Sequence, residues 1–178
     1  YGFGAVVIDA RHFVPQSRPR LFVIGVRGDI AIPSSLSGNE PSALWHPEKL
    51  VQAAHNLSDD AAPFWTWWDL PAPPKRNTTL SSLIEDAPRG VAWRDDTDYL
   101  LSLMAPTHLE KVDIAKQAGH PVIRTVFRRT RTDRQGRKKQ RAEVRFDELS
   151  GCLRTPSGGS SRQIMLFVDG DSVRSRLL

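Results

Sequence analysis

The sequence predicts a mixed α and β (α+β) protein, and three observations lead to this prediction. Short apolar, β-branched runs lie near the start of the chain, at residues 5–10 and 20–27. Apolar residues keep helical spacing in 96–118, and short apolar runs return from residue 122 onwards. We therefore expect a β-hairpin, a connecting region, and a mainly β domain that contains a helical segment.

The first two runs are expected to pair as an antiparallel hairpin. Residues 11–15 supply the turn between them. The second run, 20–27, is apolar on both faces, which is typical of a strand that is covered on both sides of a sheet. We therefore expect this hairpin to be the remnant of a larger, doubly wound sheet.

Proline interrupts residues 28–78 repeatedly, so this region is expected to be rich in loops, with one short helix at about 47–54. Residues 64–68 hold three of the five tryptophans. Such a cluster favours a role in anchoring a long connection to the core. A stacking platform for unpaired bases, formed by Trp65, Trp67 and Trp68, is the alternative.

Thr79 is expected to cap a short helix, and a longer helix over 96–118 is expected to be interrupted near Pro106. Four strands should follow, at residues 122–130, 141–149, 164–169 and 173–177. In the first of these, Val122, Ile123, Val126 and Phe127 are expected to supply a buried face.

Positive charge is concentrated in one short segment. The net charge is +5, yet residues 124–145 hold ten basic and two acidic residues, which is +8 locally and leaves −3 for the remainder. Such asymmetry favours contact with a polyanion at one place, although a solvated basic loop is the alternative. A basic two-stranded ribbon fits the major groove of DNA. The candidate contact residues are Arg131, Arg134, Arg137, Lys138, Arg141 and Arg145.

Two further segments carry candidate site residues. Pro15, Gln16, Arg18 and Arg20 form a Pro-Gln-x-Arg-x-Arg tract, and its two arginines can present guanidinium forks to one partner. A polar loop with two solvated arginines is the alternative. A Gly- and Ser-rich loop later in the chain offers close backbone approach and short donors for phosphate. Its candidate residues are Thr155, Ser157, Gly158, Gly159, Ser160, Ser161 and Arg162.

Three segments in order resemble the DNA (cytosine-5) methyltransferases. Residues 1–27 resemble the seventh and eighth motifs of that family, and residues 151–162 resemble its second recognition loop. Residues 173–178 resemble the run into its ninth motif. The resemblance implies the end of a catalytic domain (1–30), a proline-rich connecting region (31–78) and a target recognition domain (79–178).

The resemblance also implies roles for individual residues. Arg20 would hydrogen-bond the flipped cytosine and its acidic partner, while Arg18 would brace the catalytic loop. Gln16 and Arg176 join the DNA-binding residues, and Arg176 would also organise the recognition domain. The chain has no Pro-Cys motif, no Glu-Asn-Val and no Gly-rich cofactor loop, and its single cysteine, Cys152, is expected to be a small buried strand residue.

The sequence therefore predicts part of a bacterial, cytoplasmic methyltransferase of a restriction-modification system that recognises double-stranded DNA. S-adenosylmethionine would be the cofactor of the parent enzyme and would not bind this chain alone. The partner would be an N-terminal catalytic half, in the same chain or in a separate subunit. The alternatives are a non-catalytic DNA-binding subunit and, third, an RNA-binding module. No membrane span is expected, because no apolar run is long enough, and the scattered histidines indicate no metal site.

Overall fold

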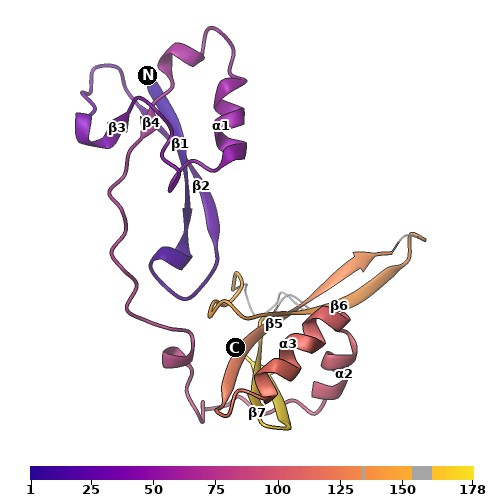
Figure 1. The fold of residues 1–178 in the computed structure, drawn as a ribbon. Coiled ribbons are helices and arrows are strands. Elements are labelled where there is room, and N and C mark those ends of the chain that lie inside the picture. Colours follow the sequence, from indigo (N-terminus) through magenta and orange to yellow (C-terminus); the bar gives the residue numbers. More distant parts are fainter. Residues whose placement is uncertain (134, 154–161) are drawn as a thin grey trace. The chain divides into compact units, whose positions relative to one another are not determined.

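A computed structural model describes residues 1–133, 135–153 and 162–178 of the chain. It is a mixed α and β structure with small antiparallel sheets, which confirms the predicted α+β class. The chain divides into two compact units (Figure 1). The first contains residues 1–13 and 18–76, and the second contains residues 14–17 and 77–178. The two strands of the predicted hairpin and residues 31–76 of the predicted connecting region (31–78) thus fall within the first unit.

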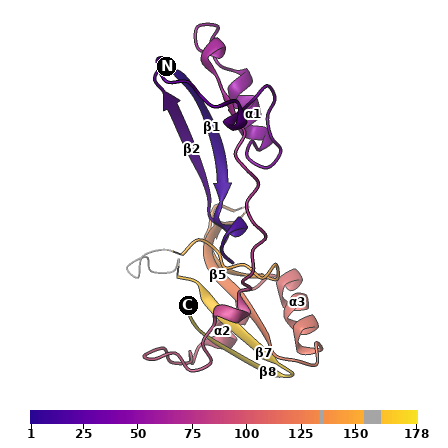
Figure 2. The same cartoon turned by 90° about the vertical axis from the view of Figure 1, so that its left-hand side faces the viewer.

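The first unit is built on the predicted hairpin (Figure 2). Strand β1 (Gly2–Asp9) pairs antiparallel with β2 (Pro19–Val26), with Val6 opposite Phe22. A second pair joins β3 (Ser37–Gly38) to β4 (Trp67–Trp68). Helix α1 (Glu48–His55) confirms the helix predicted at 47–54.

The tryptophans of this unit lie in and around its core. Val6, Trp45 and Trp68 form the buried cluster, and the Trp65 and Trp67 rings meet edge to face with centroids 5.4 Å apart. Trp68 is 5% exposed, so it anchors the connection, as one of the two sequence interpretations expects. Gly4 allows the close packing, because a Cβ at that position would lie 2.0 Å from the carbonyl oxygen of Thr66.

Strand β2, which the sequence predicts to be covered on both faces only within a larger sheet, is largely exposed in this chain. Leu21, Phe22 and Val23 are 57%, 47% and 69% exposed. The free edge of β1 is occupied, because the Thr66 amide donates to the Phe3 carbonyl and the Val7 amide donates to the Trp45 carbonyl. Within the described residues β2 has β1 as its only strand neighbour. An apolar strand is thus left uncovered.

The second unit is a sheet with helices on one face. Its strands follow the order β6-β5-β7-β8 and are all antiparallel. Their bounds are β5 Val122–Thr132, β6 Lys138–Arg145, β7 Ile164–Asp169 and β8 Ser172–Leu177. These positions confirm the four predicted strands, although β6 begins three residues earlier than expected and ends four residues earlier.

Two helices cover one face of that sheet. They are α2 (Thr97–Ser102) and α3 (Pro106–Lys116), and α3 begins at the proline where an interruption was predicted. Leu100 and Val112 from the helices pack with Val126, Ile164 and Leu166 from the sheet in one buried cluster. Before them, Ser81–Leu83 forms a 3₁₀ turn in which the Thr79 hydroxyl accepts from the Ser82 amide at 3.2 Å.

Candidate nucleic-acid interface

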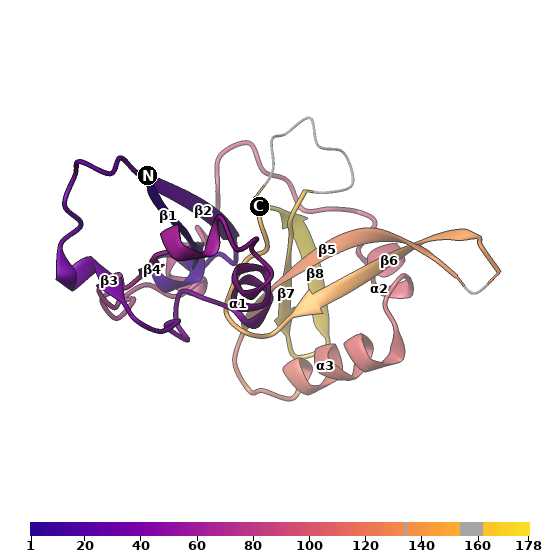
Figure 3. The ribbon, with the colours of Figure 1, turned by 90° about the horizontal axis from the view of Figure 1, so that it is seen from above.

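The longest strand pair of the second unit extends beyond the sheet as a two-stranded ribbon (Figure 3). Strand β7 pairs with β5 only over residues 122–126, whereas β6 pairs with β5 over residues 125–132. At the tip, the Asp133 carboxylate accepts from the amides of Gln135 and Arg137, both at 2.9 Å. Gly136 adopts φ +79°, a left-handed conformation that glycine tolerates best. A sequence-local turn therefore closes the ribbon.

The two faces of the ribbon have opposite chemistry because side chains alternate along a strand. Val126, Ala142 and Val144 face the helices and are buried. The other face, which we name the basic face, carries Phe127, Arg129, Arg131, Lys139 and Arg141. Phe127 was predicted to share a buried face with Val126, and this is wrong, since consecutive strand residues point to opposite sides.

Cross-strand pairing on the basic face brings like charges together. Arg129 lies opposite Arg141, and Arg131 lies opposite Lys139. Directly opposed like charges destabilise a sheet. Glu143 offsets part of this repulsion, because its carboxylate lies 3.0 Å from the Arg131 guanidinium and 3.9 Å from that of Arg129. The ribbon thus forms with an excess of positive charge on one face. A polyanionic partner would match that charge.

The other basic residues of the ribbon fall into two groups. Arg137 pairs with Asp133 at 3.0 Å, and Arg145 pairs with Asp147. The Arg145 side chain lowers the pKa of Asp147, and the Arg137 backbone amide, more than its side chain, lowers that of Asp133. By contrast, Lys138, Lys139 and Arg141 are exposed and form no ion pair within the described residues. These three cations remain available to phosphate.

A pocket of about 620 Å³ lies at the base of the ribbon. Phe127, Arg129 and Arg145 line it from the basic face, and Arg128 and Thr130 also contribute. Ser17, Gly151, Cys152 and Gln163 complete the described lining. The sequence analysis identified only Arg145 of this set. A pocket made by segments distant in the chain leaves no local pattern, and the only sequence signal was the alternation that places Phe127 among arginines.

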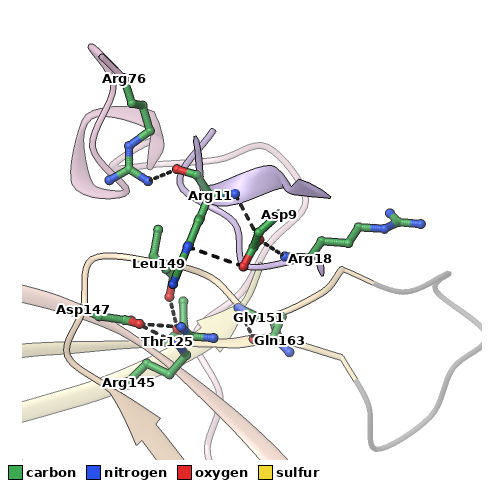
Figure 4. Close-up of polar contacts among 10 residues, drawn as sticks. All are labelled: Asp9, Arg11, Arg18, Arg76, Thr125, Arg145, Asp147, Leu149, Gly151 and Gln163. Atoms are coloured by element: carbon green, nitrogen blue, oxygen red, sulfur yellow. Dashed lines mark hydrogen bonds and ion pairs between the residues drawn. The ribbon is translucent and has the colours of Figure 1, made fainter. Parts of the chain in front are cut away.

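The segment after β6 crosses the sheet and forms one wall of this pocket. The Thr125 hydroxyl donates to the Leu149 carbonyl at 2.9 Å, and the Gly151 amide donates to the Gln163 Oε1 at 3.1 Å (Figure 4). A Cβ on Gly151 would lie 2.7 Å from that same oxygen, so a larger residue there would displace the end of the Gln163 side chain. Gln163 is 7% exposed.

The Pro-Gln-x-Arg-x-Arg tract is divided between the two units. Its first part belongs to the second unit, where Gln16 forms a parallel bridge with Ser150. The Ser17 amide donates to the Ser150 carbonyl at 2.9 Å, and the Ser150 amide donates to the Pro15 carbonyl at 2.8 Å. Gln16 is thus held by backbone pairing to the segment that follows β6.

The arginines of the tract belong to the first unit. The Asp9 carboxylate accepts from the Arg18 amide at 2.7 Å and from the Arg11 amide at 3.1 Å, which fixes the turn of the hairpin (Figure 4). The Arg18 side chain points away from this turn. Arg20 donates to the Pro19 carbonyl at 2.8 Å. Both arginines are exposed, as an intermolecular role requires.

Arg176 lies in an unexpected environment for a DNA-binding residue. It is 4% exposed, and its guanidinium donates to the carbonyls of Asp86 and Glu85. It also lies 4.5 Å from the Phe167 ring centroid and 5.1 Å from that of Trp93. These contacts disagree with the prediction that Arg176 contacts DNA. They agree with the other role that the resemblance implied for it, which is to organise the recognition domain.

Some predicted site residues lie outside the described residues. These are Arg134, Thr155, Ser157, Gly158, Gly159, Ser160 and Ser161. Arg162 is described and exposed just before β7. Cys152, which was expected to be a buried strand residue, is half-buried and lies outside the strands. Within the described part of the chain, no group of three or more His, Cys, Asp or Glu side chains is placed to hold a metal ion.

Comparisons of this chain with family models, with curated proteins and with solved structures found no match. Among the residues that the structure describes, no helix is both long and apolar enough to pass through a lipid bilayer.

Proposed function

We propose that this chain is the DNA-recognising part of a DNA (cytosine-5) methyltransferase. It would bind duplex DNA through the basic face of the ribbon so that a target cytosine can be flipped and methylated at C5 in the parent enzyme. The second unit would be the target recognition domain, and the hairpin β1–β2 would belong to the catalytic domain. The order of the three family-like segments along the sequence supports this proposal.

The observation that carries the proposal is the chemistry of the ribbon. A two-stranded β-ribbon is one of the few elements that enters the major groove. This one projects beyond its sheet and holds opposed cations on one face. Lys139 and Arg141 on that face, and Lys138 on the opposite face, form no ion pair within the described residues. Phosphates would relieve the repulsion between these side chains and supply salt-dependent affinity.

The uncovered strand β2 supports the second half of the proposal. An apolar strand exposed at Leu21, Phe22 and Val23 is normally paired or covered. The missing catalytic half would supply that cover, and Arg18 and Arg20 would then lie at the margin of the completed sheet. The sequence lacks the Gly-rich cofactor loop of the family, so we propose no methyl transfer for this chain alone.

Fluorescence anisotropy with labelled duplex DNA at a series of salt concentrations tests the proposal. The variant Lys138→Ser, Lys139→Ser, Arg141→Ser should reduce the slope of log affinity against log salt by roughly 2–3 units, because each lost phosphate contact removes about 0.9. The control Lys49→Ser, Lys75→Ser, Lys111→Ser removes the same charge from exposed positions elsewhere. Equal slopes for the two triple variants would contradict DNA binding by the ribbon.

The alternative is a non-catalytic DNA-binding subunit of a split or degenerate methyltransferase, and a Pro-Cys motif upstream in the parent gene would contradict this alternative. Calorimetric titration with S-adenosylmethionine and a methyl-incorporation assay should both be negative for this chain alone. Adding a separately expressed catalytic half should restore activity if the parent enzyme is split. The RNA-binding alternative loses support because Trp68, one of its three platform residues, is buried.

A further inference from the structure

The pocket at the base of the ribbon has a composition that phosphate binding alone does not require. We propose that it holds a single nucleotide, with its base against the Phe127–Arg129 pair and its phosphate among the arginines. This rests on the proposed function in one respect: the nucleotide would belong to the DNA that the ribbon binds. The pocket itself can be tested without duplex DNA.

Charge is the first reason. Arg128, Arg129 and Arg145 line the pocket, and none of the described lining residues is acidic. Asp147 neutralises Arg145 in part. Positive charge that lines a pocket and is only partly neutralised favours an anionic ligand such as a phosphate.

The aromatic ring is the second reason. Phe127 is half-buried, and the Arg129 guanidinium carbon lies 4.4 Å from its ring centroid. A phenyl ring and a guanidinium plane are the two surfaces on which unstacked bases pack in proteins. A site for phosphate alone gains nothing from a phenyl ring, whereas a base gains contact area from it.

The third reason is the polar wall opposite the ring. Gln163 has its Oε1 fixed by the Gly151 amide at 3.1 Å, which also fixes the orientation of the side-chain amide. Thr130 and Ser17 also line the pocket. Short donors and acceptors of these residue types can meet the edge of a base. At about 620 Å³ the pocket lies within the range of small-molecule sites, which run from about 300 to 1,000 Å³.

The test is an NMR titration of the full chain with deoxyguanosine monophosphate, following the amides of Gly151 and Cys152 in the pocket wall. We expect saturable binding with a Kd on the order of 1 mM, about −4 kcal/mol. Phe127→Leu and Arg129→Gln should each weaken it at least about fivefold, since stacking on one aromatic or guanidinium group is worth that much or more. Arg129 is exposed, so its replacement leaves the core unchanged even if Phe127→Leu affects folding.

Arg131→Gln is the matched comparison. Arg131 lies on the same face, two residues further out, and also contacts Glu143, but it does not line the pocket. It should weaken duplex binding and leave nucleotide binding unchanged. Equal effects of Arg129→Gln and Arg131→Gln on the nucleotide would overturn the proposal, because general charge would then explain the binding.

Two further arms separate the possible outcomes. If inorganic phosphate displaced the nucleotide at an equal concentration, the pocket would be a site for anions only. If no saturable shift appeared, the pocket would not bind the nucleotide. Both results overturn the nucleotide site and leave the ribbon proposal standing if duplex DNA still binds. Nucleotide binding without duplex binding would instead support the pocket while removing the proposed function.

Discussion

The two longest β-hairpins that the structure describes, β1–β2 and β5–β6, have similar backbones and opposite surfaces. In β1–β2 and in β5–β6, eight residues of one strand pair with eight of the other. The first hairpin exposes Leu21, Phe22 and Val23, whereas the second exposes arginines and lysines. The strands pair in the same way whichever side chains they expose. The exposed side chains determine the kind of partner, because exposed apolar area is buried against protein and exposed positive charge attracts polyanions.

The edges of the two hairpins differ as well. The outer edge of β1 is closed by hydrogen bonds to Thr66 and Trp45, which leaves β2 as an apolar edge. Such an edge is a template for pairing with another strand. The ribbon strands carry long cations on the basic face, and charged side chains on an edge oppose strand addition. The first hairpin is therefore expected to pair with a further strand, whereas the second is not.

The largest expected effect is on the free energy of unfolding, which should respond very differently to substitutions at buried and at exposed apolar positions. Leu166→Ala, at a position that is 0% exposed, should lower the free energy of unfolding by about 2–5 kcal/mol. Val23→Ala on β2 should stay within about 0.5 kcal/mol, because that side chain is already in solvent. Chemical denaturation followed by circular dichroism measures both. A large loss for Val23→Ala would show that β2 is covered in solution.

The next effect concerns assembly. Leu21→Thr with Val23→Thr keeps β-propensity but removes apolar area from the exposed strand. In a reconstituted enzyme, we expect affinity for the catalytic half to fall roughly a hundredfold, since burying each aliphatic side chain contributes about 1.5–3 kcal/mol. Binding of the purified parts, measured calorimetrically, tests this. DNA affinity of the isolated chain should not change, and a parallel loss there would contradict the separation of roles.

A smaller effect, on turnover, is expected from replacing Arg20 in the Pro-Gln-x-Arg-x-Arg tract. In the reconstituted enzyme, Arg20→Ala should reduce turnover roughly tenfold to a hundredfold, while DNA affinity changes little, because losing a hydrogen bond to a charged group costs about 1.5–3 kcal/mol. Arg20→Lys should rescue little, since an ammonium cannot reproduce a bidentate fork. Single-turnover rates and a melting curve distinguish this from a structural role, in which thermal stability and DNA binding would fall together.

The smallest effect is a pH dependence of stability in the second unit. Arg145 lowers the pKa of Asp147 in the folded state, so the ion pair stabilises the fold above the unfolded pKa of Asp, about 4. This contribution is lost as the pH falls through the lower, folded pKa. Solvent screens the pair, because the Asp147 side chain is 50% exposed. In the Asp147→Asn variant, the denaturation midpoint should therefore decline only slightly less steeply below pH 4. If the decline were unchanged, other carboxylates would be responsible for the loss of stability in acid.

Secondary structure was largely predictable because its signals are local. Pro106 begins α3 where the interruption was expected, and the turn at residues 169–171 separates β7 from β8. Gly136 closes the ribbon with a positive φ. Turn residues and strand runs of this kind act over a few neighbours, so one sequence contains them in full.

The candidate site was predictable only in part. The concentration of charge at residues 124–145 is visible in the sequence, and it is what suggested a polyanion. Which cations are neutralised depends on cross-strand register, which places Arg131 beside Glu143 and Arg145 beside Asp147. Arg176 was taken as a DNA contact, yet the structure buries it against the carbonyls of Glu85 and Asp86, about ninety residues earlier in the chain.

The elements, their order and the sign of the charge on the ribbon could thus be predicted from the residues alone, because propensity, turn chemistry and composition are properties of neighbouring residues. Three features are visible only in the folded chain: the extent of exposure of β2, the burial of Arg176, and the pocket that Phe127, Gln163 and Ser17 line together. These features come from contacts between segments far apart in the chain, and their positions depend on how the strands pair and pack.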